Sequence, residues 1–198
     1  MTGAELTDRL LAAIGRVDGG KVKNQAKQSP EDWNGIRAAI HELSGLPVVI
    51  DDSSGGNIAG LLARAKLLKQ MHAARLVIID YLQLIRAGKA ESRNYEIAEI
   101  TRAIKRFAID EQLTVILLSQ LTRQADDGMP GLKDLRDSGA IESDADLVLF
   151  LCKPATDEDR LILVSLAKNR SGRSGKFKLI FIPDQTRFEC YSDRPAGF

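Results

Sequence analysis

The residue best placed to do chemistry is Asp80, which follows four consecutive apolar residues, Leu76 to Ile79. A short, wholly apolar run predicts a strand that is buried on both faces of a parallel sheet. Open α/β sheets bind ligands at the carboxyl ends of their strands, so the carboxylate would stand at the ligand edge. There it could hold Mg²⁺ through oxygen or water, as the acid of a Walker B motif does. A lone match of this kind more often marks an Asp that forms a turn or caps a helix.

The segments that must position Asp80 alternate between helical and extended patterns. Helices are predicted by four signals: a capping box at Thr2 and Glu5, a Ser29–Pro30 start signal, and apolar stripes over 58–71 and over 97–111. Strands are expected at 47–51, 114–120 and 146–151, and three more alternating strands, antiparallel to close the sheet, at 161–167, 176–182 and 186–190. This order predicts an α/β layered fold with a mostly parallel sheet flanked by helices.

Two loops carry basic residues. Residues 86–94 form a predicted flexible loop with Arg86, Lys89 and Arg93. Residues 122–139 form a longer predicted loop that includes Arg136 and Gly139. Loops this long inside a compact domain are usually functional.

The composition excludes several classes of protein. The 198 residues suggest one domain, and 28 basic against 27 acidic residues leave a net charge of +1. No global field therefore draws the chain to nucleic acid or membrane, and any such contact must be local. Two cysteines are too few for a disulfide framework, which favours the cytoplasm. We find no signal peptide and no apolar run that would span a bilayer, so no membrane partner is expected.

Four segments then occur in one order along the chain. They are IDYLQL at 79–84, LSQLTR at 118–123, DLRDSGAIESDAD at 134–146 and KNRSG at 168–172. Together they closely resemble the C-terminal, RecA-like motor domain of the DnaB family of replicative DNA helicases. The resemblance runs from residue 1 to about residue 191, and the third segment is highly specific. Thr122 departs from the family, which usually has Asn or Ser there.

The resemblance implies roles at a nucleotide site that binds ATP and Mg²⁺. Asp80 would be the Walker B acid on Mg²⁺. Gln120 would be the polar sensor that contacts the γ-phosphate and links the nucleotide state to the DNA loops, and an amide suits this role because it can donate and accept. Lys168 and Arg170 would reach the neighbouring subunit's nucleotide, with Arg170 as an arginine finger. Such a site lies between subunits and implies a homo-oligomer, a hexameric ring in this family.

The resemblance also implies contacts with single-stranded DNA. Arg136, Asp137 and Gly139 match the loop that grips the DNA backbone in the central channel, where Arg supplies charge and Gly permits close approach. The basic loop with Arg86, Lys89 and Arg93 is a second candidate. Primase and a helicase loader would be protein partners. Taken singly, Gln120 could instead be a strand terminator, and residues 168–170 a solvated turn.

One departure from the family is sharp. The phosphate-cradling pattern G-x-x-x-x-G-K-[ST] occurs nowhere in the chain. The Gly175–Lys176 pair, for example, is followed by Phe177 where the pattern needs a hydroxyl residue. The family's catalytic Glu precedes the Met that aligns with Met1. We therefore expect a partial RecA-like domain, from a fragment or a truncated gene product, that hydrolyses no ATP alone. The alternative to a helicase motor is a vestigial module that keeps DNA or subunit contacts only; a recombinase is disfavoured by residues 136–146.

Overall fold

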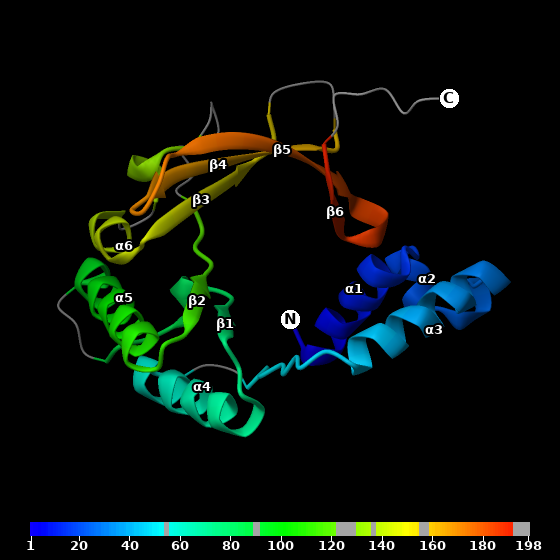
Figure 1. The fold of residues 1–198 in the computed structure, drawn as a ribbon, viewed down its shortest axis with the longest axis horizontal. Coiled ribbons are helices and arrows are strands. Elements are labelled where there is room, and N and C mark those ends of the chain that lie inside the picture. The colour runs from blue at the N-terminus through cyan, green and yellow to red at the C-terminus, as the bar shows by residue number, and fades with distance from the viewer. Residues whose placement is uncertain (54–55, 89–91, 122–129, 136–137, 155–158, 192–198) are drawn as a thin grey trace. The chain divides into compact units, whose positions relative to one another are not determined.

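A computed structural model of the chain describes residues 1–53, 56–88, 92–121, 130–135, 138–154 and 159–191. These residues form six α-helices and six strands, the mixture expected of an α/β fold. The helices are α1 (Gly3–Gly15), α2 (Gly19–Lys23), α3 (Pro30–Ser44), α4 (Ile58–His72), α5 (Arg93–Asp110) and α6 (Ser138–Asp144). The strands are β1 (Leu76–Ile79), β2 (Thr114–Leu117), β3 (Leu147–Cys152), β4 (Leu161–Asn169), β5 (Gly175–Ile182) and β6 (Arg187–Cys190) (Figure 1).

The described strands belong to two sheets. Strands β1 and β2 form a parallel pair, and β3 to β6 form a four-stranded sheet in the order β3-β4-β5-β6. The pairing of β5 with β6 is antiparallel, with Phe181 opposite Phe188 and their rings 4.8 Å apart. The parallel pair and the antiparallel β-rich end were both expected from the sequence.

The chain divides into two compact units. The first unit comprises Met1–Ser53, Lys153–Val164 and Phe177–Phe198, and the second unit comprises Ser54–Cys152 and Ser165–Lys176. The prediction of a single domain is not tested by this division.

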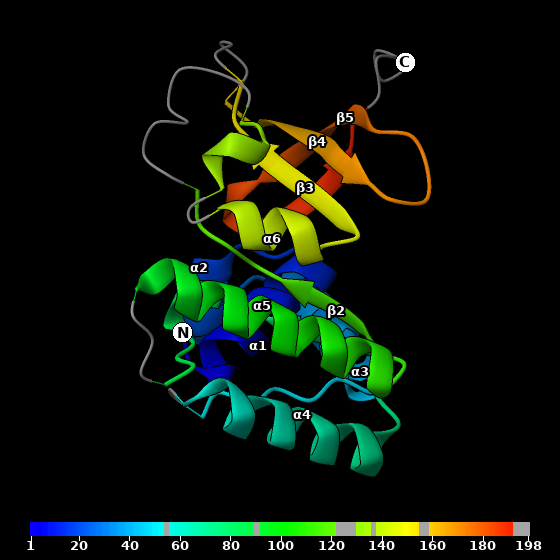
Figure 2. The same ribbon diagram turned by 90° about the vertical axis from the view of Figure 1, so that its left-hand side faces the viewer.

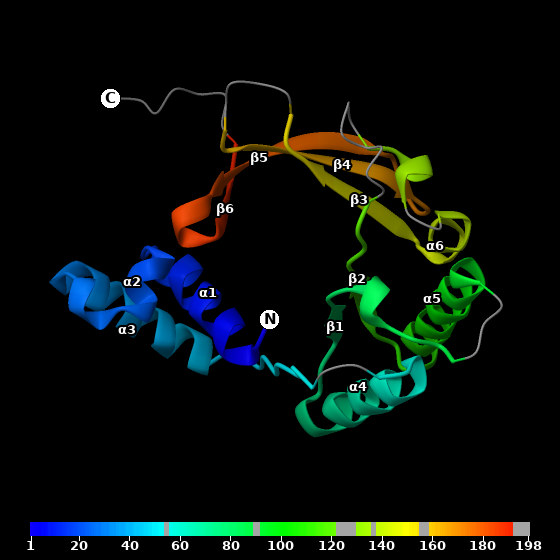
Figure 3. The same cartoon turned by 180° about the vertical axis from the view of Figure 1, so that it is seen from behind.

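In the first unit, α1 packs along α3 (Figure 3). Both helices begin as the sequence predicts, because Thr2 with Glu5, and Ser29 with Asp32, form complete capping boxes. The helices approach so closely that a Cβ built on Gly35 would stand 2.6 Å from the carbonyl oxygen of Gly15. Only glycine fits at this crossing.

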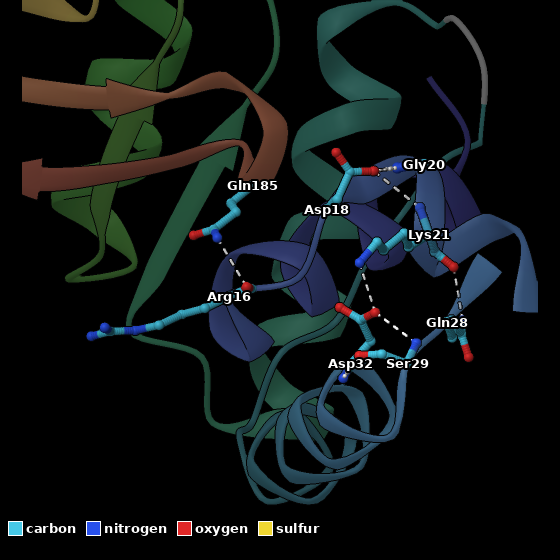
Figure 4. Close-up of polar contacts among 8 residues, drawn as sticks. All are labelled: Arg16, Asp18, Gly20, Lys21, Gln28, Ser29, Asp32 and Gln185. Atoms are coloured by element: carbon cyan, nitrogen blue, oxygen red, sulfur yellow. Dashed lines mark hydrogen bonds and ion pairs between the residues drawn. The ribbon is translucent and has the colours of Figure 1, made fainter.

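Polar contacts fix the ends of these helices (Figure 4). Lys21 donates to the Asp32 carboxylate over 2.8 Å, and the same carboxylate accepts from the backbone N–H of Ser29. Gln185 donates to the carbonyl oxygen of Arg16 over 2.9 Å. This last bond joins two segments of the first unit that lie far apart in the sequence.

The second unit is built around one hydrophobic cluster. Its largest fully buried side chains are Leu82, Ile97 and Ile100, and the last two belong to the apolar stripe of α5. Figure 2 shows α5 lying between α4 and α6, and Figure 1 agrees. Lys66 and Lys69 of α4 form ion pairs with Glu111, just past the end of α5. These contacts hold the helices that flank β1 and β2.

The expected burial of the strands on both faces is wrong. Leu76 and Ile78 of β1 are exposed, whereas Ile79 is buried. The same alternation occurs in β3, where Val148 and Phe150 are buried. Successive side chains point to opposite faces of a sheet, and the described residues cover only one face. These strands therefore carry more apolar side chains than the described residues bury.

Three further element predictions need correction. Residues 47–51 form no strand among the described residues, and Val48, Val49 and Ile50 are exposed. Their composition suits a strand, but none of the described strands pairs with them. Gly139 lies in α6 rather than in the loop before it, and Arg93 is the first residue of α5. Helix α5 begins there because Ser92 caps it, its hydroxyl accepting from the N–H of Tyr95.

Among the described residues, no helix combines the length and the apolar character needed to cross a bilayer.

Candidate functional site

The two strand-end residues singled out in the sequence lie at one edge of the β1–β2 pair. Ile79 is opposite Leu117 in the parallel register, so Asp80 and Gln120 both follow the carboxyl ends of their strands. Pairing continues past the strands, because Leu118 N–H donates to Ile79 O over 3.0 Å. Asp80 and Gln120 are both exposed there.

Gln83 ties the two strand ends together. It lies in the 3₁₀ turn Leu82–Leu84 that follows Asp80. Its Nε2 donates to Ser119 Oγ over 3.0 Å, and its Oε1 accepts from the backbone N–H of Gln120 over 3.3 Å. An amide that donates and accepts in this way links the position of Asp80 to that of Gln120.

The surroundings of Asp80 suit a cation that brings its own ligands. Within the described ranges, no cluster of three or more His, Cys, Asp or Glu side chains is placed to hold a metal ion. Mg²⁺ usually keeps several waters and binds one or two carboxylates together with substrate phosphates. A single exposed carboxylate at a strand end therefore fits Mg²⁺ better than a metal that needs a full protein cage.

Lys168 and Arg170 are held by the segment that contains α6. Lys168 Nζ donates to the carbonyl oxygen of Glu142. Arg170 Nη2 donates to the carbonyl oxygen of Ser143 over 3.0 Å, and its Nη1 pairs with Asp146 Oδ1 over 3.1 Å. Two cations that are nearby in sequence are thus anchored to one short stretch, 142–146.

Asp146 is the centre of charge in this group. Its carboxylate also pairs with Lys105 of α5. The hydrogen bond from Lys105, with the nearby charges of Arg170 and Lys168, holds the pKa of Asp146 below its usual value. The carboxylate is therefore ionised at neutral pH and can hold both partners.

The basic loop is anchored by a buried carboxylate of α5. Glu96 is buried in the first turn of α5 and accepts from Arg93 and from the N–H of Ala87. The hydrogen bond from Arg93 lowers the pKa of Glu96 against the opposing effect of burial. Arg93 also donates to the carbonyl oxygens of Gln83 and Ile85. These bonds give Arg93 a structural role beside any contact with DNA.

Arg86 is placed differently from Arg93. Its side chain is 68% exposed, compared with 30% for Arg93, and its guanidinium lies 3.5 Å from Glu96. Of the two, Arg86 has more surface available to a phosphate. Lys89 lies outside the described residues.

The predicted DNA-gripping residues are only partly described. Arg136 and Asp137 lie outside the described residues, and α6 begins at the next residue. A Cβ built on Gly139 would meet nothing within 4 Å. No described neighbour therefore requires glycine at this position.

A family model described as the DnaB-like helicase C-terminal domain matches residues 1–190. The chain belongs to the DnaB-like helicases. It is 35% identical to the replicative DNA helicase DnaB of Geobacillus stearothermophilus and 34% identical to the replicative DNA helicase DnaC of Bacillus subtilis. Each comparison covers 95% of this chain and 43% of the relative. The chain thus spans less than half the length of these relatives.

Solved structures share the fold. A DnaB-like replicative helicase, solved in a study of its interactions with primase, matches 97% of this chain and 49% of its own, with a TM-score of 0.89 at 32% identity. A second solved structure, an ATPase domain, matches 97% of this chain and 72% of its own, with a TM-score of 0.89 at 33% identity. The α/β, RecA-like fold class predicted from the sequence is confirmed.

In this DnaB-like chain four of the predicted site residues form two groups. Asp80 and Gln120 lie at one strand edge, and Lys168 and Arg170 share the 142–146 stretch. Sequence reasoning missed Gln83 and Asp146 as site residues, although both lie inside the segments that carry the resemblance. It also missed Glu96, for which the Arg93–Glu96 spacing of three residues on a helix was an available signal.

Proposed function

We propose that this chain is the C-terminal motor portion of a replicative DNA helicase, which uses ATP to translocate on single-stranded DNA and unwind the duplex. The observation that carries the proposal is the Asp80–Gln120 edge, closed by Gln83. Such an edge gives an acid and an amide side by side at the ligand end of parallel strands.

The residues at this edge divide the work. Asp80 holds Mg²⁺ directly or through water, and Gln120 contacts the terminal phosphate. Gln83 keeps the two strand ends in register, so that a change at one is transmitted to the other. Bound Mg·ATP supplies the phosphoryl group and the charge that neutralises its oxygens.

Lys168 and Arg170 act on the nucleotide of the neighbouring subunit. Arg170 has a half-exposed side chain, so its guanidinium can be held by its own chain and still face a neighbour. A finger supplied in this way stabilises the charge of the transferred phosphoryl group. The assembly that this requires is a ring, and we propose the six-membered ring of the family.

DNA is gripped without reading its sequence. We propose phosphate contacts from the Arg136 side chain and from the main chain of Asp137 and Gly139, supported by Arg86 and Lys89 of the basic loop. Phosphate contacts fix position and carry no base information, as a translocating motor requires. Primase and a helicase loader are proposed as protein partners by family membership.

Similarity to replicative helicases over 95% of the chain favours this proposal over a module that only binds. The test uses the helicase ring that contains this domain, with its phosphate-binding loop. Asp80→Ala and Arg170→Ala rings should each lose ATP hydrolysis, by roughly 10³–10⁵ for Arg170, while still binding nucleotide. Asp159→Ala, which breaks an exposed ion pair with Lys153, is the matched control and should keep full activity.

Mixing the two inactive variants decides whether the site is shared. Each interface takes Asp80 from one subunit and Arg170 from the next, so mixed rings should recover part of the activity. Mixed rings that show only the sum of the two inactive parents would contradict the proposed role of Arg170.

A further inference from the structure

Asp146 makes contacts that restrain Arg170 at two points. Its Oδ1 pairs with Arg170 Nη1 over 3.1 Å, and its carbonyl oxygen accepts from the backbone N–H of Arg170 over 2.9 Å. The carbonyl of Ser143 takes Nη2 over 3.0 Å. The main chain and the tip of Arg170 are therefore both fixed to the 143–146 stretch.

These contacts leave part of the guanidinium available. A guanidinium has five N–H donors in a rigid planar fork, and the contacts above use one on each terminal nitrogen. The side chain is 52% exposed. Arg170 can therefore keep its hold on Asp146 and Ser143 and present its other donors to an anion from outside the chain.

Asp146 is itself held in place. It directly precedes β3, and its carboxylate pairs with Lys105 of α5. One turn earlier on α5, the hydroxyl of Thr101 donates to Asp144 over 2.7 Å. Helix α5 thus supports the stretch from which Arg170 is aimed.

An exposed ion pair of this kind contributes little to stability, because solvent screens it and two side chains must be ordered. A contact that adds little to folding can still fix direction. Fixing a long Arg side chain before the transition state forms removes an entropic cost from the chemical step.

We propose that Asp146 is the positioning residue of Arg170, and that it aims the guanidinium at the nucleotide of the neighbouring subunit. This inference rests on the proposed function and adds a residue to it. Asp146 touches no substrate; it acts only through Arg170.

The experiment measures ATP hydrolysis by the assembled helicase ring over a range of ATP concentrations. Asp146→Ala should lower kcat by about 10²-fold, the scale of a misplaced catalytic group, and change KM by less than about twofold. Asp146→Asn keeps the shape and one acceptor, and should fall between Asp146→Ala and the unmodified ring. Asp159→Asn is the control for loss of a carboxylate from an exposed pair, and should leave kcat unchanged.

Two comparisons separate positioning from a merely structural role. The double variant Asp146→Ala/Arg170→Ala should be no slower than Arg170→Ala alone, because Asp146 has no other route to the reaction. Asp146→Ala subunits mixed with Asp80→Ala subunits should recover activity, since intact Asp80 and aimed Arg170 then meet at some interfaces. Mixed with Arg170→Ala subunits they should recover none.

The outcomes distinguish the two proposals. If Arg170→Ala rings hydrolyse ATP normally, the proposed role of Arg170 fails, and Asp146 fails with it. If Arg170→Ala is inactive while Asp146→Ala and Asp146→Asn keep kcat, only the positioning role is overturned. Rings that no longer assemble in both Asp146 variants would also overturn it, because Asp146 would then be a scaffold residue.

Discussion

Gln83 donates a hydrogen bond from Nε2 to Ser119 Oγ over 3.0 Å, and this bond joins the turn after Asp80 to the end of β2. The carbonyl oxygen of Gln83 in turn accepts from Arg93 over 3.0 Å. The proposed nucleotide-binding edge, at the carboxyl ends of β1 and β2, and the start of α5 therefore meet at Gln83. A displacement of the strand ends can therefore reach the basic loop through Gln83, which is bonded to Ser119 and to Arg93.

Gln83→Ala should lower the kcat of ATP hydrolysis strongly while lowering the free energy of unfolding only modestly. Each lost hydrogen bond contributes about 1 kcal/mol to the free energy of unfolding, whereas a misplaced group costs up to about 10²-fold in kcat. Denaturant titration and steady-state ATPase assays of the helicase ring measure both. Gln70→Ala, on the exposed surface of α4, is the control. A kcat loss no larger than that of Gln70→Ala would remove Gln83 from the site.

The chain alone should show no measurable ATPase activity. Phosphoryl transfer depends on positioning and charge, and the chain contains no G-x-x-x-x-G-K-[ST] pattern to cradle phosphates. The assay uses the purified chain with Mg·ATP and single-stranded DNA. Turnover that survives purification and disappears in Asp80→Ala would contradict this expectation.

Replacing Arg93 by Ala and replacing Arg86 by Ala should have different effects on stability and on DNA binding. Removing Arg93 leaves the buried Glu96 carboxylate without its main partner, which costs about 1–3 kcal/mol or more of unfolding free energy. Removing the exposed Arg86 should leave stability nearly unchanged and weaken binding of single-stranded DNA. Thermal unfolding and fluorescence anisotropy measure the two effects. The opposite pattern would assign the phosphate contact to Arg93.

The element order was predictable because capping boxes and apolar periodicity are local signals. Thr2 with Glu5 and the stripe of Ile97, Ile100 and Ile104 show this directly. The burial of β1 was not predictable from the sequence. An apolar run such as Leu76–Ile79 indicates that both faces of the strand can be buried, but it does not show which face the described residues cover. The strand predicted at 47–51 was wrong for a related reason, because a strand forms only where another strand pairs with it.

The candidate residues Asp80 and Gln120 could be picked out from the sequence, but the residues that hold the candidate site together in the structure could not. Asp80 and Gln120 follow apolar runs and are visible in sequence. Asp146 supports Arg170 from 24 residues away, and no local pattern relates the two. Gln83 reaches Ser119 only because β1 and β2 are parallel neighbours, which is a property of the sheet.

Acid should remove the contribution of Asp32 to stability. The hydrogen bond from Lys21, and after it the hydrogen bond from the N–H of Ser29, lower the pKa of Asp32 from 3.8 to about 2. A depressed pKa means that the unfolded chain binds the proton first, so the contribution is complete above pH 3.8 and is lost as pH falls to about 2. The stability difference between unmodified protein and Asp32→Asn should therefore shrink over this window. Lys21→Met should lose most of the same pH dependence; a difference that stays constant from pH 5 to 2 would contradict the assignment.

DNA binding should come from summed phosphate contacts. Because the net charge is +1, one chain offers few contacts, and affinity built by counterion release needs many. The isolated chain should bind single-stranded DNA barely, whereas the ring should bind it without sequence preference and with strong salt dependence. Arg136→Ala in the ring should weaken binding equally on every sequence and flatten the salt slope. Anisotropy with homopolymer and mixed oligonucleotides over a salt series tests this. Tight, salt-insensitive or sequence-selective binding by the isolated chain would show that the Arg136 loop does something other than grip phosphates.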